Sequence, residues 1–259
     1  MKLRLLKLDA FADRPLTGNP AAIVPLDAWL PDALMQSIAA ENNQSETAFF
    51  VPQGDGYGLR WFTPNDEVAL CGHATLGAAY VLFRIGAAGG EAIAFETLSG
   101  TLTVCRAGDD LVMDFPTVRS APVAVPPMLV EGLGAAPREV WAGADYMAVF
   151  GAEAEVRALK PDMRALERLD RRGVIASAPG ATADFCSRFF APKFGVPEDP
   201  VTGSAHCQLA PYWSKKLGKK ELLAHQVSAR GGEVRCVDRG QRVELAGTVA
   251  PYLDATISL

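Results

Sequence analysis

The sequence predicts an α+β protein made of two similar halves. The phrase PNDEVALCGHATLGAAY, which begins at Pro64, returns at Pro197 as PEDPVTGSAHCQLAPYW. In each copy the phrase continues into a mostly apolar run of helical length, and short runs typical of strands surround it. Each half is therefore expected to hold strands around one apolar helix.

In the first half, residues 3–12 alternate as a strand does, and a turn at Thr17–Asn19 leads into a second, apolar strand. Pro31 and Asp32 predict the start of a helix that ends at Asn42 and Asn43. Residues 46–51 and 57–62 predict a hairpin. Small and apolar residues on every face predict a buried helix over Ala74–Leu82. Three further strands are expected at 92–97, 100–105 and 110–115.

The two halves are separated by PTVRSAPVAVPP, whose four prolines exclude a helix or a central strand. This stretch predicts domains over residues 1–118 and 119–259, with the last strand a candidate to pair with the first domain. In the second half we expect a helix over 204–217 and strands at 138–150, 172–178, 184–190, 225–229, 233–237 and 241–249.

Composition excludes several classes of protein. The net charge is −5, and the chain has no Lys/Arg-rich run, which disfavours nucleic-acid and membrane partners. No segment reaches the ~20 apolar residues of a membrane span, and the N-terminus is unlike a signal peptide. Five cysteines without a CxxC pair disfavour a disulfide framework and suit a reducing compartment. A cytoplasmic protein is expected.

The repeated phrase predicts an anion site at each helix start. A helix that begins just after Gly72 or Gly203 offers free backbone N–H groups and the positive end of its dipole to a carboxylate. Glycine permits close approach of a ligand to the backbone. His73 and Ser204 occupy the expected N-cap positions. The alternative is that Ser204 only caps its helix and the glycines only make turns.

Several side chains could carry proton chemistry or hold a metal ion. His73, beside a buried helix, would have a pKa near neutrality and could transfer a proton. Asp199 stands between two prolines, where the alternative is a turn-forming aspartate. Glu46, taken by itself, reads as a solvated loop residue. His206 is a candidate to line the site, and His225 is expected on a strand. The spacing of Cys71 and Cys207 from the histidines is poor for chelation, so no metal is expected.

Nucleotide-binding and serine-hydrolase signatures are missing from the sequence, which contains no GxGxxG after the first strand, no GxxxxGK[ST] and no GxSxG. Four ordered stretches instead closely resemble the PhzF family, the phenazine biosynthesis-like isomerases: DAFADRPLTGNPAAIV, AENNQSETAFF, RWFTPNDEVALCGHATLG and GVPEDPVTGSAH. The resemblance covers nearly the whole chain. It implies the fold of diaminopimelate epimerase, in which each of two domains wraps a sheet around a central helix and the site lies in the interdomain cleft. It also implies a homodimer.

The resemblance further assigns roles to residues. It makes Glu46 the general acid/base, with His73 and Asp199 as catalytic partners. The residues expected to hold a small carboxylate substrate are Ser45, Gly72, Gly203 and Ser204. The implied reaction moves a proton between carbons of a dihydro-hydroxyanthranilate without a metal or organic cofactor. A dry site would raise the pKa of the base toward neutrality.

Two alternatives stay open. Related epimerases and racemases use two opposed cysteines. Here Cys71 matches the first of them, but Thr202 stands at the second position. Cys71 is therefore expected to be a buried small residue, and an epimerase would need Glu46 with another partner. The other alternative is a non-catalytic carboxylate-binding module.

Overall fold

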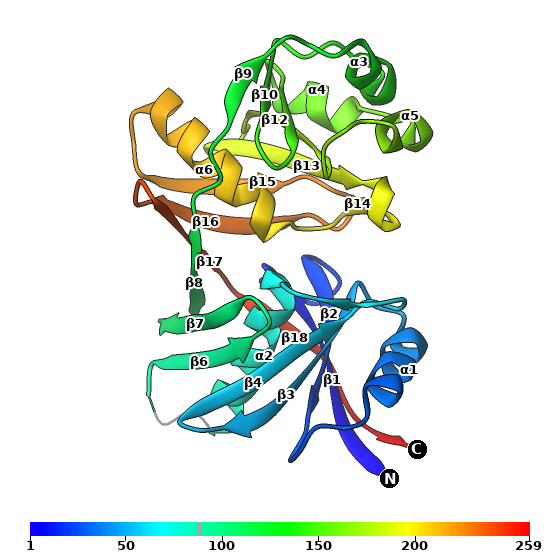
Figure 1. Cartoon of the computed structure of the whole chain (residues 1–259). Helices are drawn as coiled ribbons and strands as arrows, with labels where there is room; N and C mark the ends of the chain where they lie inside the picture. Colours follow the sequence, from blue (N-terminus) through cyan, green and yellow to red (C-terminus); the bar gives the residue numbers. More distant parts are fainter. Residues whose placement is uncertain (87–89) are drawn as a thin grey trace. The chain divides into compact units, whose positions relative to one another are not determined.

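The computed structural model describes residues 1–86 and 90–259. The chain divides into two compact units, the first made of Met1–Asp114 with Ala246–Leu259, and the second of Phe115–Leu245. The predicted boundary at 118 lies close to the passage from the first unit to the second. The strand expected at 241–249 ends at Gly247, and a further strand that was not expected, β18 (Val249–Ser258), belongs to the first unit (Figure 1).

In the first unit, strands surround a buried helix. β1 pairs antiparallel with β2 and, along its whole length, with β18; β2 and β3 are parallel, and β3 and β4 antiparallel. The helices of this unit are α1 (Asp32–Asn42) and α2 (Gly72–Arg84), and its strands are β1 (Lys2–Ala10), β2 (Asn19–Pro25), β3 (Glu46–Gln53), β4 (Gly56–Phe62), β5 (Glu67–Val68), β6 (Ala92–Thr97), β7 (Gly100–Ala107), β8 (Asp110–Pro116) and β18 (Val249–Ser258).

Small side chains let α2 lie inside this sheet. The helix packs on β1, β2, β3, β7 and β18, and the run from His73 to Ala79 is buried. At Gly77 a Cβ atom would approach Ile23 Cδ1 to 3.0 Å, so even alanine would crowd the sheet. A separate apolar cluster lies under α1 and includes Met35, Phe49 and Phe62. The predicted buried helix is thus observed.

The second unit also builds its sheet against one long helix. Its helices are α3 (Pro127–Leu133), α4 (Glu153–Ala158), α5 (Met163–Glu167), the 3₁₀ turn η1 (Pro192–Phe194) and α6 (Gly203–Leu217), and its strands are β9 (Ala121–Val123), β10 (Glu139–Ala142), β11 (Tyr146–Val149), β12 (Val174–Pro179), β13 (Phe185–Ala191), β14 (Val196–Asp199), β15 (Glu221–Gln226), β16 (Gly232–Asp238) and β17 (Arg242–Gly247).

Alternation along β12 shows that this sheet is covered on both faces. Ala176 and Ala178 belong to the apolar core under α3–α5, whereas the intervening Ser177 accepts a hydrogen bond from Trp213 Nε1 of α6 at 2.9 Å. Trp213 also stacks on Phe185, with ring centroids 5.7 Å apart. The sheet therefore lies between α6 and the three short helices.

Three expectations for this unit were wrong in detail. The strand expected at 225–229 lies earlier in the chain, because β15 runs from Glu221 to Gln226. The strand expected over 138–150 is interrupted by a bend, which gives β10 and β11. Helices α3, α4 and α5 were not expected; each is shorter than eight residues, too short to be stable by propensity alone, and depends on packing against the sheet. No helix in the described parts of the chain is both long and apolar enough to cross a membrane.

Candidate active site

Glu46 opens strand β3, directly after Ser45. Asn43, in the left-handed conformation that asparagine tolerates, ends α1 just before them. Parallel pairing of Glu46 with Ala21 of β2 places this strand end beside the start of α2. Glu46 Oε2 lies 3.1 Å from His73 Nε2, and the Glu46 side chain is only 20% exposed. The glutamate that looked like a loop residue is therefore half-buried against the predicted histidine.

The start of α2 supplies the other two members of this group. Cys71 is the N-cap residue, Gly72 the first helical residue and His73 the second, so the expected N-cap position of His73 was wrong. Cys71 Sγ lies 3.5 Å from His73 Nδ1. Glu46, Cys71 and His73 are the residues that we call the Glu46 cluster.

Opposite charges set the protonation of the cluster. Burial raises the pKa of Glu46, but the nearby His73 outweighs it, so that the pKa of Glu46 is lowered. Burial lowers the pKa of His73, whereas Cys71 and Glu46 raise it, and the result lies well above its ordinary value. The expectation of a raised pKa for Glu46 was therefore wrong. At neutral pH the two side chains form a carboxylate–imidazolium pair.

Cys71 remains a thiol under these conditions. Burial, reinforced by the charge of Glu46, raises the pKa of Cys71 to about 11. A protonated thiol is a poor nucleophile and a poor base.

A metal ion could also use the Glu46 cluster. One oxygen, one sulfur and one nitrogen atom of its members lie within 4.8 Å of one another. These are donors that zinc accepts. Glu46 lies far from Cys71 and His73 in the sequence, so no motif spacing could predict that the three residues meet. That the protein works without a metal stays a prediction.

The second unit gathers the remaining predicted residues at the start of α6. Asp199 ends β14, Thr202 is the N-cap residue, and Gly203 and Ser204 are the first and second helical residues. Ser204 is thus not the N-cap, contrary to expectation. The Thr202 hydroxyl donates to Asp199 Oδ2 at 2.5 Å, which ties the carboxylate to the helix start.

The side chain of Gln226 holds the turn before α6 in place by hydrogen bonds. No pattern in the sequence had indicated this role for Gln226. Its side chain, 1% exposed, accepts from Thr202 N at 2.8 Å and donates to Asp199 O at 2.7 Å and to Thr202 Oγ1 at 3.2 Å. Gln226 lies far along the chain on β15, so only the tertiary structure brings it here.

The other histidines lie outside this chemistry. His206 is fully buried, its Nδ1 lies 2.8 Å from Thr202 O, and burial lowers its pKa to about 4. Because the His206 side chain has no exposed surface, it does not fit the expected lining role. His225 lies on β15, as predicted, with Nε2 3.4 Å from Glu233 Oε2.

Gly203 is not required by its protein neighbours. A Cβ atom placed there would meet Leu245 Cδ1 at 3.6 Å, an ordinary contact, and its φ lies outside the left-handed region. The fold would accept alanine, which leaves close approach of a ligand as a reason for glycine at this position.

Comparisons with known proteins identify the family and the fold. An uncharacterized isomerase of Pseudomonas aeruginosa is 51% identical over 259 residues and covers all of both chains. A crystal structure of a PhzF-family protein of Enterococcus faecalis superposes with a TM-score of 0.98 at 43% identity, again over all of both chains. A hydroxyproline epimerase of Agrobacterium vitis shares the fold, with a TM-score of 0.60 at 12% identity, covering 100% of this chain and 93% of the epimerase.

The fold is therefore the diaminopimelate epimerase-like fold that the resemblance implied. The names of the curated relatives support an isomerase activity of a general kind. The family described as phenazine biosynthesis-like protein matches residues 8–255. The chain belongs to this PhzC-PhzF family.

Proposed function

We propose that the protein is a cofactor-independent isomerase that moves a proton between two carbons of a small carboxylate substrate, with Glu46 as the general acid/base. The observation that carries the proposal is the pair formed by the half-buried Glu46 and the buried His73, whose charged atoms lie 3.1 Å apart.

The proposed reaction has two balanced steps. The Glu46 carboxylate accepts a proton from a carbon of the substrate, and the electron pair of the broken C–H bond moves into an adjacent unsaturated system. The glutamic acid then returns the proton to a different carbon, so that no atom is gained or lost. His73 keeps Glu46 ionised at rest. Because the Glu46 side chain is 20% exposed, the proton that it carries between the two steps can exchange with solvent deuterium.

The lowered pKa of Glu46 bears on the substrate class. A weaker base removes only a relatively acidic proton at a useful rate. The substrate would therefore have a C–H bond whose carbanion is delocalised over a conjugated system. A dihydro-hydroxyanthranilate has this property and is the first compound to test. Ser45, Gly72, Gly203 and Ser204 are the proposed residues for binding it, with Asp199 to position it.

Proton NMR in D2O tests the proposal directly. With the wild-type protein, we expect deuterium to enter dihydro-hydroxyanthranilate or to move between its carbons. The same result with another member of a panel of small cyclic and α-amino carboxylates, tested in parallel, would equally support the proposal. Glu46→Gln should slow this exchange by about 100-fold or more, because loss of the base costs that much. Glu41→Gln, an exposed change near the end of α1, is the matched control and should leave exchange intact.

Two other outcomes would identify the competing functions. Exchange that survives in Glu46→Gln but is lost in Cys71→Ala would favour a thiol-based epimerase. Binding without any exchange across the panel would favour a carboxylate-binding module. Either result would contradict the role of Glu46.

A further inference from the structure

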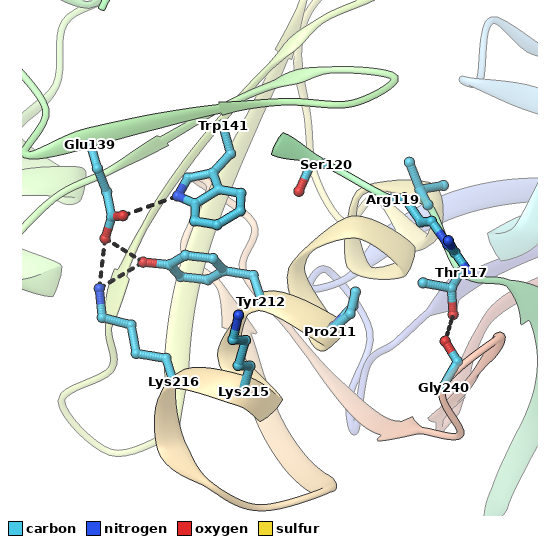
Figure 2. Close-up of a pocket in the computed structure, with 11 residues that line it drawn as sticks. Thr117, Arg119, Ser120, Glu139, Trp141, Pro211, Tyr212, Lys215, Lys216 and Gly240 are labelled. Atoms are coloured by element: carbon cyan, nitrogen blue, oxygen red, sulfur yellow. Dashed lines mark hydrogen bonds and ion pairs between the residues drawn. The ribbon is translucent and has the colours of Figure 1, made fainter. Parts of the chain in front are cut away.

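A cavity lies at the C-terminal half of α6. It has a volume of about 640 Å³ and lies within the second unit, between α6, β10 and the segment 117–120 (Figure 2). Tyr212, on its wall, follows Ser204 by about two helical turns, or about 12 Å along the axis. The cavity is thus distinct from the start of α6, where Asp199 and Ser204 lie. Its volume falls within the about 300–1,000 Å³ typical of small-molecule sites.

One wall of the cavity is fixed to α6 by a proline. Pro211 has no backbone N–H, so the carbonyl of Cys207 lacks its usual helical partner. Val118 N donates to that carbonyl at 3.0 Å. Thr117 is held in turn, because its Oγ1 donates to Gly240 O at 3.0 Å. The segment that closes the cavity is therefore anchored by hydrogen bonds.

The opposite wall is aromatic and is held by one carboxylate. The rings of Trp141 and Tyr212 meet edge to face, 5.5 Å apart. Glu139 accepts hydrogen bonds from Trp141 Nε1 at 3.0 Å, Tyr212 Oη at 2.6 Å and Lys216 Nζ at 2.7 Å (Figure 2). Hydrogen bonds from Lys216, Tyr212 and Trp141 lower the pKa of Glu139 to about 2. The wall is organised before any ligand arrives, and the charge of Glu139 is offset by Lys216.

Two cations at the cavity remain without an acidic partner among the residues that the structure describes. Arg119 donates from Nη2 to the neutral Gln241 Oε1 at 3.0 Å, and Lys215 has no ion pair there. Both side chains belong to exposed residues at the rim. The cavity thus combines flat aromatic surface with an excess of positive charge.

From this combination we propose that the cavity is a second binding site, for a small planar aromatic carboxylate. The ring system would pack against Trp141 and Tyr212, and the carboxylate would meet Arg119 and Lys215. Neither Glu46 nor His73 takes part, so the proposal is independent of the proton-transfer reaction.

Quinoline-2-carboxylate is a suitable probe, with neutral quinoline as the uncharged control. The chain has four tryptophans, so an ¹⁵N-indole spectrum is simple, and Trp141→Phe assigns the signal of Trp141. We expect the carboxylate to shift that signal in wild type and equally in Glu46→Gln. By calorimetry, the double variant Arg119→Ala/Lys215→Ala should bind about tenfold more weakly, as two partly screened charges are lost. Arg164→Ala, an exposed change on α5, should bind as wild type does.

Three outcomes would overturn the proposal. The first is no binding of the carboxylate up to about 10 mM, which leaves less than about 3 kcal/mol of affinity. The second is binding that leaves the Trp141 signal unmoved or that is unchanged in the double variant. The third is a dimer in sedimentation that Lys215→Glu dissociates, since the cavity would then be a subunit interface.

Discussion

Glu46 and His73 show how two buried groups can stay charged together. Each alone would be driven toward its neutral form by burial, but the 3.1 Å separation of their charged atoms makes the pair more favourable than either neutral side chain. Burial and the charge of Glu46 raise the pKa of the neighbouring Cys71 and keep it protonated, although His73 acts in the opposite direction. One proton-accepting carboxylate therefore lies beside one cation and one thiol.

The first prediction concerns the titration of His73. Its Cε1–H NMR signal should titrate well above pH 6.5 in wild type, because Glu46 and Cys71 raise its pKa. In Glu46→Gln the midpoint of the His73 titration should fall. Burial disfavours the charged imidazolium, and the carboxylate that stabilises it in wild type is then missing. The chain has three histidines, and His206 should remain neutral down to about pH 4, which simplifies assignment. An unchanged midpoint in the variant would contradict the pairing.

The pair also makes stability depend on pH. Because the pKa of His73 is raised, its contribution is full below pH 6.5 and is lost as pH rises through the folded value. Because the pKa of Glu46 is lowered, its contribution is present above pH 4.5 and is lost as pH falls through the folded value. Urea unfolding from pH 4 to 9 should show a flatter curve for the double variant Glu46→Gln/His73→Gln than for wild type. Parallel curves would mean that the pair does not stabilise the fold.

A further residue-scale prediction separates folding from binding at Gly203. Gly203→Ala should leave the free energy of unfolding unchanged or raise it by about 0.5 kcal/mol, because its Cβ meets only an ordinary contact. If the glycine admits substrate, KM for deuterium exchange should rise by about tenfold. Gly218→Ala is the matched control. With φ at +70°, it should lose about 1 kcal/mol of stability without a change in KM. An unchanged KM in Gly203→Ala would remove Gly203 from the binding residues.

At the scale of elements, the start of α6 depends on a strand that lies later in the chain. β15 carries Gln226, whose amide satisfies both Thr202 N and Asp199 O. Because these backbone groups are shielded from water, losing their partner is costly. The orientation of Asp199 therefore depends on the packing of β15 as much as on its own turn.

Gln226→Ala is expected to lower the free energy of unfolding by about 2–4 kcal/mol, because two buried backbone groups lose their hydrogen bonds. Denaturant unfolding measures this loss. His225→Ala, on the neighbouring position of the same strand, should cost less than about 1 kcal/mol because its ion pair is partly exposed. Equal losses of stability in both variants would mean that β15 is sensitive to substitution for reasons other than the hydrogen bonds of Gln226 to Thr202 and Asp199.

On the scale of the whole molecule, the first unit is discontinuous in sequence. β18 pairs with β1 from Lys2↔Ser258 to Ala10↔Val249, and Leu259 N donates to Met1 O at 2.8 Å. The two ends of the chain thus lie together in one antiparallel pair. Residues 1–114 by themselves keep β2 but lack β18, the other partner of β1.

This arrangement predicts the outcome of a rearranged chain. Residues 246–259 joined through a short glycine-containing hairpin to residues 1–114 should fold alone, because β18 and β1 become neighbours in sequence. Residues 1–114 without β18 should show no cooperative thermal transition. Circular dichroism on both chains tests this. Failure of the rearranged chain to fold would mean that the first unit needs the second for stability.

The sequence by itself determined the local elements and the residue types of the site. Alternating and helical periodicity depend on neighbours a few positions apart, so most strands of the first unit and the helices α2 and α6 could be predicted, whereas β5 and β18 were not. The repeated phrase likewise identified Gly72, His73, Asp199, Gly203 and Ser204 as residues at or near the starts of these helices.

Only the tertiary structure decided which of these residues meet and with what charge. The contact of Glu46 with His73 crosses from one element to another, and its energy depends on burial that no spacing records. Gln226 under Thr202, the short helices α3–α5 and the cavity beside Pro211 arise in the same way. Such features depend on contacts between residues far apart in the chain, whose free energy exists only once the elements pack together.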